Sequence, residues 1–401
     1  MTAGRRSRFL ALLQTSLVAV AFAMQLVASN AINPILPLYR EHLGLSTVVL
    51  SLTFVLYVVS LVTGLALLAK PTFARHAPAL VLLSLVALIV SDLLSLGLDP
   101  WAILIGRVFV GVAGGLATGA ASALVVGTIG AAGRDVTTTG NLLGAVVGVV
   151  AAQAMVSHAG LDAPQLVFSG HAIVSAMILV VLAVLFVIRR RENARVLEHQ
   201  TDALDLGPKV RRRMPAGGTD LLCTASVVWI ASSAGVVYSA TVFAELGQPL
   251  VQAVGPTLLL AASATGQLLS PLLTRIAPWI SGMVAAAAGA AGFVAGALLA
   301  IPVIALVGFV LLGAGTGIAY RAALVTLTRG TSSARQGALA SAFGAITYTA
   351  NASAILLIGW LSDLVGLIEI ATGAFTLIAI AALVALRWAP RLRDTVEPPR
   401  L

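Results

Sequence analysis

The chain has little charge and almost no cysteine, and each shortage excludes a class of protein. Charged residues make up 10% of its 401 residues and hydrophobic residues 59%, whereas soluble domains carry roughly 25% charge. So few polar residues cannot cover a water-facing surface, which excludes a soluble globular protein. The single cysteine, Cys223, excludes an intrachain disulfide and a cysteine-rich metal site. Because it lies in an apolar run, we expect it to be a small buried hydrophobic residue.

The sequence motifs of common enzymes and of nucleotide binding are also missing. No H-E-x-x-H, G-x-S-x-G or S-x-x-K pattern occurs, and lysine is present only at positions 70 and 209. The glycine-rich stretches lack the Gly-Lys-Ser/Thr of a phosphate loop. These absences argue against a membrane-embedded enzyme and against direct coupling to ATP. We expect no cofactor and no metal site, and the lack of an aromatic-interleaved basic patch argues against a nucleic-acid partner.

Long apolar runs are what the chain does have. A transmembrane helix needs about 20 mostly apolar residues, and twelve runs meet this length. The predicted spans are 9–32, 46–69, 77–97, 101–128, 137–157, 166–188, 221–244, 250–273, 280–301, 303–327, 337–361 and 366–388. The first run is longer than the roughly 7–15 residues of a signal-peptide core, so we expect a retained helix. The sequence predicts an all-α membrane protein.

Basic residues set the orientation of these spans. If residue 1 is cytoplasmic, 21 of the 24 Lys and Arg residues fall in cytoplasmic segments, and the outer loops hold only Arg40. Cytoplasmic loops carry such an excess because basic residues resist translocation. We therefore expect a multi-pass protein with both termini in the cytoplasm. Low lysine with high alanine, arginine and glycine is typical of a GC-rich prokaryote, which places the protein in its plasma membrane.

The chain divides into two similar halves. Residues 189–220 form the one long polar stretch, and they separate an N-terminal part, 1–188, from a C-terminal part, 221–401. The halves echo each other about 200 residues apart, since the glycine-rich stretch 111–121 resembles 313–323. We expect two six-helix bundles joined by a cytoplasmic linker, with a shared site near the middle of the membrane.

Several motifs resemble the major facilitator superfamily over essentially the whole chain. The stretch Asn33-Pro-Ile-Leu-Pro-Leu-Tyr39 is similar to the end of that family's first helix, and Arg107-Val-Phe-Val-Gly111 resembles the start of the motif associated with proton coupling. The series Gly140-x-x-x-Gly144-x-x-x-Gly148 resembles the glycine motif of drug antiporters, with Ala145 in place of its proline. The resemblance implies a twelve-span secondary transporter of the drug-efflux type.

The loop between the second and third spans departs from the family pattern. The family has Gly-x-x-x-Asp-Arg-x-Gly-Arg-Arg there, and this chain has Pro71 where the Asp belongs. Lys70 and Arg75 keep the basic character that the resemblance assigns to a cytoplasmic gate loop. The small residues Gly111, Gly115, Gly140, Gly144 and Gly148 are expected to let helices approach closely.

Only Asp92, Arg107 and Arg321 place a charge well inside the apolar runs. Such a charge costs roughly 2.5–3.5 kcal/mol, which makes each a candidate functional residue. Asp92 and Arg107 flank the turn at Asp99-Pro100 almost symmetrically, so antiparallel helices would hold them at equal depth, about 10 Å below the turn. We expect them to pair. The pair is either a static salt bridge or a coupling site in which Asp92 exchanges a proton, and the resemblance at Arg107 favours coupling.

Polar residues outline a mostly apolar substrate cavity. Gln14 and Gln25 are eleven residues apart and share a helix face. The predicted cavity residues are Gln14, Gln25, Asn30, Trp229, Ser233, Tyr238, Tyr320, Arg321, Tyr348 and Asn351. For any single one, a helix–helix hydrogen bond is the simpler role. For Arg321 the alternatives are contact with lipid headgroups and an anion site in the cavity.

These observations favour a monomeric secondary transporter in a lipid bilayer that exports small hydrophobic or amphipathic compounds in exchange for protons. Scattered hydrogen-bonding groups in an apolar pocket suit such substrates. Three alternatives stay open at this point. They are a carrier of a polar metabolite, a carrier of an organic anion held by Arg321, and a lipid flippase on the same scaffold.

Overall fold

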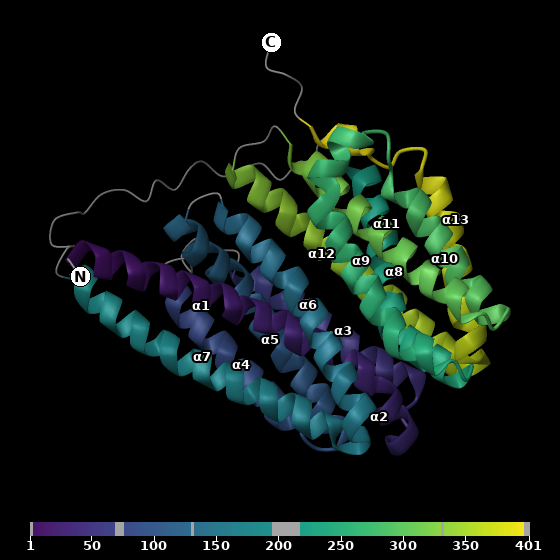
Figure 1. The fold of residues 1–401 in the computed structure, drawn as a ribbon, viewed down its shortest axis with the longest axis horizontal. Helices are drawn as coiled ribbons and strands as arrows, with labels where there is room; N and C mark the ends of the chain where they lie inside the picture. Colours follow the sequence, from purple (N-terminus) through teal and green to yellow (C-terminus); the bar gives the residue numbers. More distant parts are fainter. Residues whose placement is uncertain (1–2, 69–75, 130–131, 195–216, 330–332, 397–401) are drawn as a thin grey trace, which may run out of the picture. The chain divides into compact units, whose positions relative to one another are not determined.

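The computed structural model describes residues 3–68, 76–129, 132–194, 217–329 and 333–396, and in these ranges the regular secondary structure is entirely helical. Twelve helices have 17 to 33 residues, and Figure 1 shows them by label. Those of the first half are α1 Ala3–Ala31, α3 Thr47–Leu68, α4 Ala77–Leu94, α5 Pro100–Ile129, α6 Ala132–Ala159 and α7 Ala163–Ala194. Those of the second half are α8 Gly218–Glu245, α9 Pro249–Ile276, α10 Gly282–Leu298, α11 Pro302–Thr328, α12 Ser333–Val365 and α13 Leu367–Ala385.

Each predicted span coincides with one of these helices, which confirms the all-α membrane class. In the described residues, ten stretches are long and apolar enough to cross a membrane. One of them, Leu143–Arg189, covers parts of both α6 and α7, and α10 is apolar but slightly short. The helices are thus consistent with twelve crossings. The short helix α2, Leu36–Leu43, was not predicted and follows the 3-10 turn Asn33–Ile35.

Proline and glycine set many of the helix boundaries. Pro100, Pro249 and Pro302 each stand at the first position of a helix, where the missing N–H costs nothing and the fixed φ favours the first turn. Gly44, which follows α2, has φ +61°, and Gly366 between α12 and α13 has φ +132°. Both conformations strain any residue with a Cβ atom, so glycine permits these abrupt ends.

Contacts divide the chain into two compact units, and the first consists of residues 1–29, 60–148 and 164–211. Small residues bring its helices together. A Cβ atom on Gly148 would lie 2.5 Å from the carbonyl oxygen of Val27, and one on Gly64 would lie 3.0 Å from Gly115 Cα. Backbone therefore meets backbone between α1 and α6 and between α3 and α5. Helices α1 and α7 also lie side by side, joined by hydrogen bonds described below (Figure 1).

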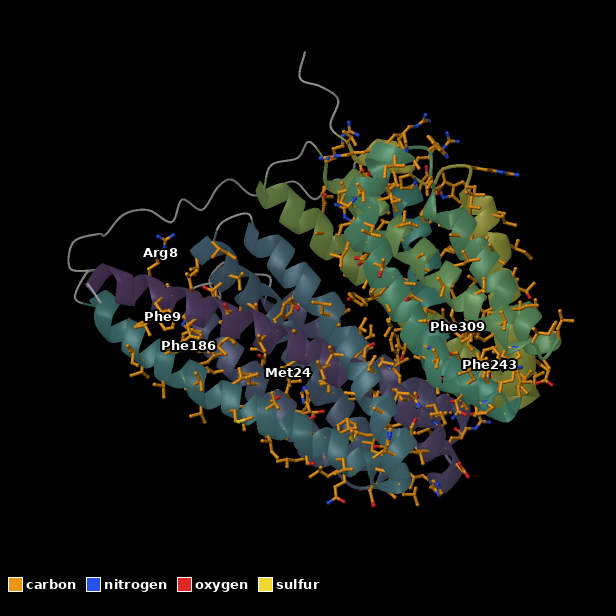
Figure 2. All side chains as sticks on the ribbon, in the orientation of Figure 1. Arg8, Phe9, Met24, Phe186, Phe243 and Phe309 are labelled. Atoms are coloured by element: carbon orange, nitrogen blue, oxygen red, sulfur yellow. The ribbon has the colours of Figure 1, made fainter. Side chains whose placement is uncertain are left out.

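The second unit consists of residues 30–59, 149–163 and 212–401. Helix α8 packs against α9, α11, α12 and α13, and also against α2. The rings of Phe243, Phe293, Phe309 and Phe375 form an aromatic core between α8, α10, α11 and α13. Figure 2 labels two of them, Phe243 and Phe309. The division into halves at 1–188 and 221–401 stays a prediction.

Helices α10 and α11 approach each other more closely than ordinary side chains would allow. A Cβ atom on Gly308 would lie 2.7 Å from the backbone nitrogen of Phe293, and one on Gly292 would lie 2.8 Å from Gly308 Cα. Gly289 and Gly296 face the backbone of Leu312 and Ala305 in the same way. Much of this interface is main chain against main chain, so few of its contacts can change through rotamers alone.

One small expectation was wrong. Cys223 is exposed near the start of α8 rather than buried in the core. In a membrane helix, an apolar environment can be lipid instead of protein, and hydropathy does not distinguish the two.

Candidate functional site

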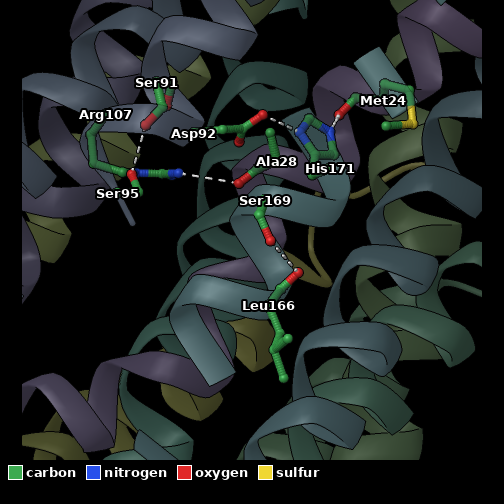
Figure 3. Close-up of polar contacts among 9 residues, drawn as sticks. All are labelled: Met24, Ala28, Ser91, Asp92, Ser95, Arg107, Leu166, Ser169 and His171. Carbon is green, nitrogen blue, oxygen red and sulfur yellow. Dashed lines mark hydrogen bonds and ion pairs between the residues drawn. The ribbon is translucent and has the colours of Figure 1, made fainter. Parts of the chain in front are cut away.

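The carboxyl group of Asp92 is the best buried acid among the described residues. Asp92 lies near the C-terminal end of α4 with 1% of its surface exposed. Its Oδ2 atom is 2.7 Å from Nδ1 of His171, which is on α7 and is 7% exposed (Figure 3). A carboxyl group in hydrocarbon surroundings needs a polar partner, and the imidazole provides it. His171 is thus a site residue that sequence reasoning missed.

The second nitrogen of the same imidazole reaches a third helix. His171 Nε2 is 3.0 Å from the carbonyl oxygen of Met24 in α1 (Figure 3). One ring therefore joins α4, α7 and α1 within the first unit. The only signal in the sequence was a lone histidine in the apolar run 166–188, and nothing in that run indicated its partners.

The expected pairing of Asp92 with Arg107 is wrong, because both groups have other partners. Arg107 is 3% exposed, and its two terminal nitrogens donate to the carbonyl oxygens of Ala28, at 3.3 Å, and Ser29, at 3.1 Å. These carbonyls belong to the last turn of α1, where a helix lacks internal donors and carries the negative end of its dipole. Arg107 caps that helix end. Whether Asp92 and Arg107 take part in coupling stays a prediction.

Two of the predicted cavity residues in α1 contact neighbouring helices instead. Gln25 is buried, and its Nε2 donates to the carbonyl oxygen of Val110 at 2.5 Å, while its Oε1 has no partner in the described part of the chain. Gln14 accepts a hydrogen bond from Arg189 at 2.9 Å. Asn30, just before the end of α1, is partly buried. Gln25 therefore keeps one buried polar atom, Oε1, that could bind a ligand.

In the second unit the structure brings together most of the predicted aromatic and polar residues. Trp229 of α8 stacks on Tyr320 of α11 with ring centroids 4.7 Å apart, and it meets the edge of Tyr348 of α12 at 5.4 Å. One turn further along these helices, Asn351 donates to Ser233 at 2.8 Å. We call these five residues the aromatic cluster.

The aromatic cluster holds two unsatisfied polar atoms. Trp229 Nε1 and Asn351 Oδ1 are buried, and neither finds a hydrogen-bond partner among the residues that the structure describes. Leaving a buried donor or acceptor unpaired costs about 1–3 kcal/mol each. The cluster thus combines ring faces with one free donor and one free acceptor, which is a suitable lining for a flat, mostly apolar molecule.

Tyr238 connects neighbouring helices in this conformation. It is 1% exposed, its hydroxyl donates to the carbonyl oxygen of Ile355 at 2.5 Å, and Ser51 Oγ lies 2.7 Å away. It therefore joins α8 to α12 and α3 and does not line an accessible surface, which corrects the cavity prediction for this residue. Arg321, also predicted to line the cavity, is half-buried in α11.

The structure describes most of the predicted helix-packing glycines, whereas the predicted gate loop lies outside the described residues. Gly144 and Gly148 lie against the backbone of α1, and Gly115 lies against Gly64 of α3. Gly111 is buried in α5. Gly140 is in α6, in a stretch whose contacts are not described, and Lys70 and Arg75 lie outside the described residues.

A second group of polar contacts lies at the end of α8 that carries Glu245. Arg40 of α2 forms an ion pair with Glu245 at 2.8 Å, and both line a cavity of about 350 Å³ together with Thr241. A few residues after Arg40, the backbone N–H groups of Thr47 and Val48 donate hydrogen bonds to the carboxylate of Asp363 of α12, at 2.6 and 3.0 Å. These are the first two N–H groups of α3, which lack partners inside the helix.

Comparisons with known proteins agree with this architecture. The sequence profile described as Major Facilitator Superfamily matches residues 18–354. No curated protein sequence matches the chain significantly. Because the profile covers most of the chain, it establishes the family.

Similar solved structures include three transporters. A bacterial homolog of the human lysosomal transporter Spinster, inward-facing and unoccupied, has a TM-score of 0.73 and 12% identity, covering 97% of this chain and 99% of that one. A D-xylose-proton symporter has 0.69 and 15%, covering 97% and 99%. The nucleoside transporter NupG has 0.66 and 12%, covering 94% and 98%. At these identities the likeness concerns the fold alone, and with the matching profile it shows that this chain belongs to the Major Facilitator Superfamily.

Proposed function

We propose that the protein is a proton-coupled secondary transporter that exports small hydrophobic or amphipathic compounds by alternating access. The aromatic cluster is the observation that supports this substrate class most strongly. Its ring faces offer dispersion and π contacts to flat apolar molecules, and its free Trp229 N–H and Asn351 carbonyl can each bind one polar atom of a ligand.

A buried acid supports the proton coupling. Asp92 is enclosed by helices, and an ionisable group inside a membrane span is a functional candidate because it is costly to keep there. An organic-anion carrier would depend on Arg321, which is half-buried in α11. Arg107 lends it less support, because its guanidinium binds the carbonyls of α1. In this proposal the halves 1–188 and 221–401 rock around the site, as in other transporters built from repeats.

The proposed setting follows from the charge distribution. The excess of basic residues in alternate loops supports cytoplasmic termini, and the composition supports the plasma membrane of a prokaryote. The protein would act as a monomer, with the lipid bilayer, protons and a small-molecule substrate as its partners.

The test uses purified protein in proteoliposomes with an imposed pH gradient. The probes are ethidium, rhodamine 6G and benzalkonium, which share lipophilic character but differ in shape. We expect the gradient to accelerate transport of at least two of them. A ring contact between Trp229 and the substrate would be worth about 0.5–1.5 kcal/mol, so Trp229→Ala should raise KM by about 2- to 13-fold.

The matched control is Trp360→Ala, because Trp360 is 54% exposed on α12. It should leave KM unchanged. Equal effects of the two substitutions would remove the aromatic cluster from the substrate site. Transport that ignores the pH gradient for all three probes would overturn the proton coupling.

A further inference from the structure

The hydrogen bonds of His171 restrict where protons can be. Its Nε2 atom faces the carbonyl oxygen of Met24 at 3.0 Å. A carbonyl oxygen only accepts hydrogen bonds, so Nε2 must carry a hydrogen and donate it. This assignment determines what the other ring nitrogen can do.

The 2.7 Å contact between Nδ1 and Asp92 then requires one further proton. If His171 is neutral, its single hydrogen is on Nε2, so Nδ1 is an acceptor and Asp92 must be the protonated donor. If Asp92 is a carboxylate, Nδ1 must carry the hydrogen and the ring is an imidazolium. In both forms one proton lies between the two atoms. Without it, two lone pairs would face each other at hydrogen-bonding distance.

We propose that Asp92 and His171 share a single proton that holds α4 and α7 together beside α1, and that losing this proton opens the contact. The inference rests on the proposed transport function and names the site and the step of its proton coupling. In this step the N–H or O–H bond between the two groups breaks and the proton passes to a water molecule. A carboxylate and a neutral imidazole remain, and the ring has one hydrogen for two acceptors. While that hydrogen stays on Nε2 and binds Met24, the lone pair of Nδ1 faces the carboxylate and the contact with Asp92 is lost.

The surroundings of the pair contain few other charges. Asp92 is the only charged residue of α4, and Arg107 is the only one of α5. The basic residues of α1 are confined to its first turns and include Arg8; those of α7 are in its last turns, where Arg189 binds Gln14. In α6, Arg134 and Asp135 lie near its start and His158 near its end.

This distribution gives the freed carboxylate a second partner. Once it leaves His171, Arg107 on the adjacent α5 is the one cation in the middle of these helices. The ion pair predicted from the equal depth of Asp92 and Arg107 would then belong to the deprotonated state. A guanidinium does not lose its own proton in proteins, so the shared proton alone switches the partner.

Two substitutions fix the site in opposite states. Asp92→Asn replaces the carboxyl with an amide that donates to Nδ1 and cannot release its hydrogen, so the contact between α4 and α7 should persist at every pH. His171→Gln removes the titratable ring and the geometry of both bonds. The matched control is His158→Gln, because His158 is an exposed histidine of α6 whose one hydrogen bond within the described residues is to a carbonyl of its own helix, at 2.7 Å.

The experiment is hydrogen–deuterium exchange of the full chain in lipid nanodiscs, from about pH 5 to pH 9, a range that includes the usual titration of histidine. Rates are corrected for the intrinsic effect of pH, and the reporter segments are 20–31 and 165–175. Losing a hydrogen bond to an ionised group is worth roughly a tenfold change in opening. In the wild type, corrected exchange should rise about tenfold with pH.

Asp92→Asn should stay protected throughout, His171→Gln should exchange fast at both extremes, and His158→Gln should follow the wild type. A wild type without a pH transition, or a transition that survives in Asp92→Asn, would overturn the proposal. If one variant fails to fold, the other still decides, because either must abolish the transition. The assay needs no substrate: a transition without transport of any probe would keep the proton site and reject only the proposed function.

Discussion

The carboxylate of Asp363 holds the first turn of α3 against the end of α12, and removing it should loosen this contact. It accepts two backbone N–H groups that have no other partner in their helix. Replacing an aspartate that caps a helix costs typically 0.5–2 kcal/mol. Asp363→Ala removes two such hydrogen bonds, and because Asp363 is exposed water compensates in part, so we expect a cost of about 1–2 kcal/mol. Asp363→Asn keeps one acceptor and should cost about half as much.

The assay measures opening at this end of the second unit directly. Thr241 lines the cavity beside Arg40 and is 3% exposed, so Thr241→Cys in a Cys223→Ser background reports access by a membrane-impermeant maleimide. A change of 1–2 kcal/mol raises the open population about 5- to 30-fold, and the labelling rate should rise by the same factor in Asp363→Ala. The matched control is Asp162→Asn, an exposed acid for which the structure shows no side-chain hydrogen bond. Equal labelling rates in Asp363→Ala and in the control would refute this reasoning.

Two further predictions concern packing and capping in the first unit. Gly148→Ala should lower stability by about 1–3 kcal/mol because its Cβ atom would meet the backbone of Val27. The control Gly170→Ala, whose Cβ atom has open space, should be neutral or stabilising. Thermal unfolding in detergent compares the two variants, and equal melting temperatures would contradict the close approach of α1 and α6. Arg107→Lys should lower stability by about 1–2 kcal/mol, because one ammonium group cannot replace the two guanidinium nitrogens that bind Ala28 and Ser29. A loss of stability no larger than that of Arg189→Lys in the same assay would argue against this capping role.

Hydropathy and proline were enough to predict the long helices. The second predicted span, 46–69, corresponds to α3 at Thr47–Leu68, and the tenth, 303–327, to α11 at Pro302–Thr328. A helix buried in lipid requires an uninterrupted apolar run, so the ends of that run predict the helix boundaries. Helix α2 was missed because it mixes a buried Tyr39 with Arg40, Glu41 and His42, a pattern without a clear apolar run.

The site was harder to predict, because depth can be read from the sequence and direction cannot. The symmetry of Asp92 and Arg107 about the turn at Asp99-Pro100 gave equal depths. It gave no information on which neighbour each side chain faces. His171 is 79 residues from Asp92, and the carbonyls of Ala28 and Ser29 are backbone groups that any sequence offers. The aromatic cluster was easier to predict, since Trp229 and Tyr348 were selected as polar residues within apolar runs and the fold brings them together.

The close contact between α10 and α11 offers a fixed reference for measuring helix movements during transport. Gly289, Gly292, Gly296 and Gly308 lie against the backbone of the opposing helix, so we expect α10 and α11 to move together as one rigid pair. Spectroscopic probes at exposed positions of the two helices, Val284 and Val310 for example, would give a constant reference distance. Movements of the other helices during a transport cycle could then be measured relative to α10 and α11.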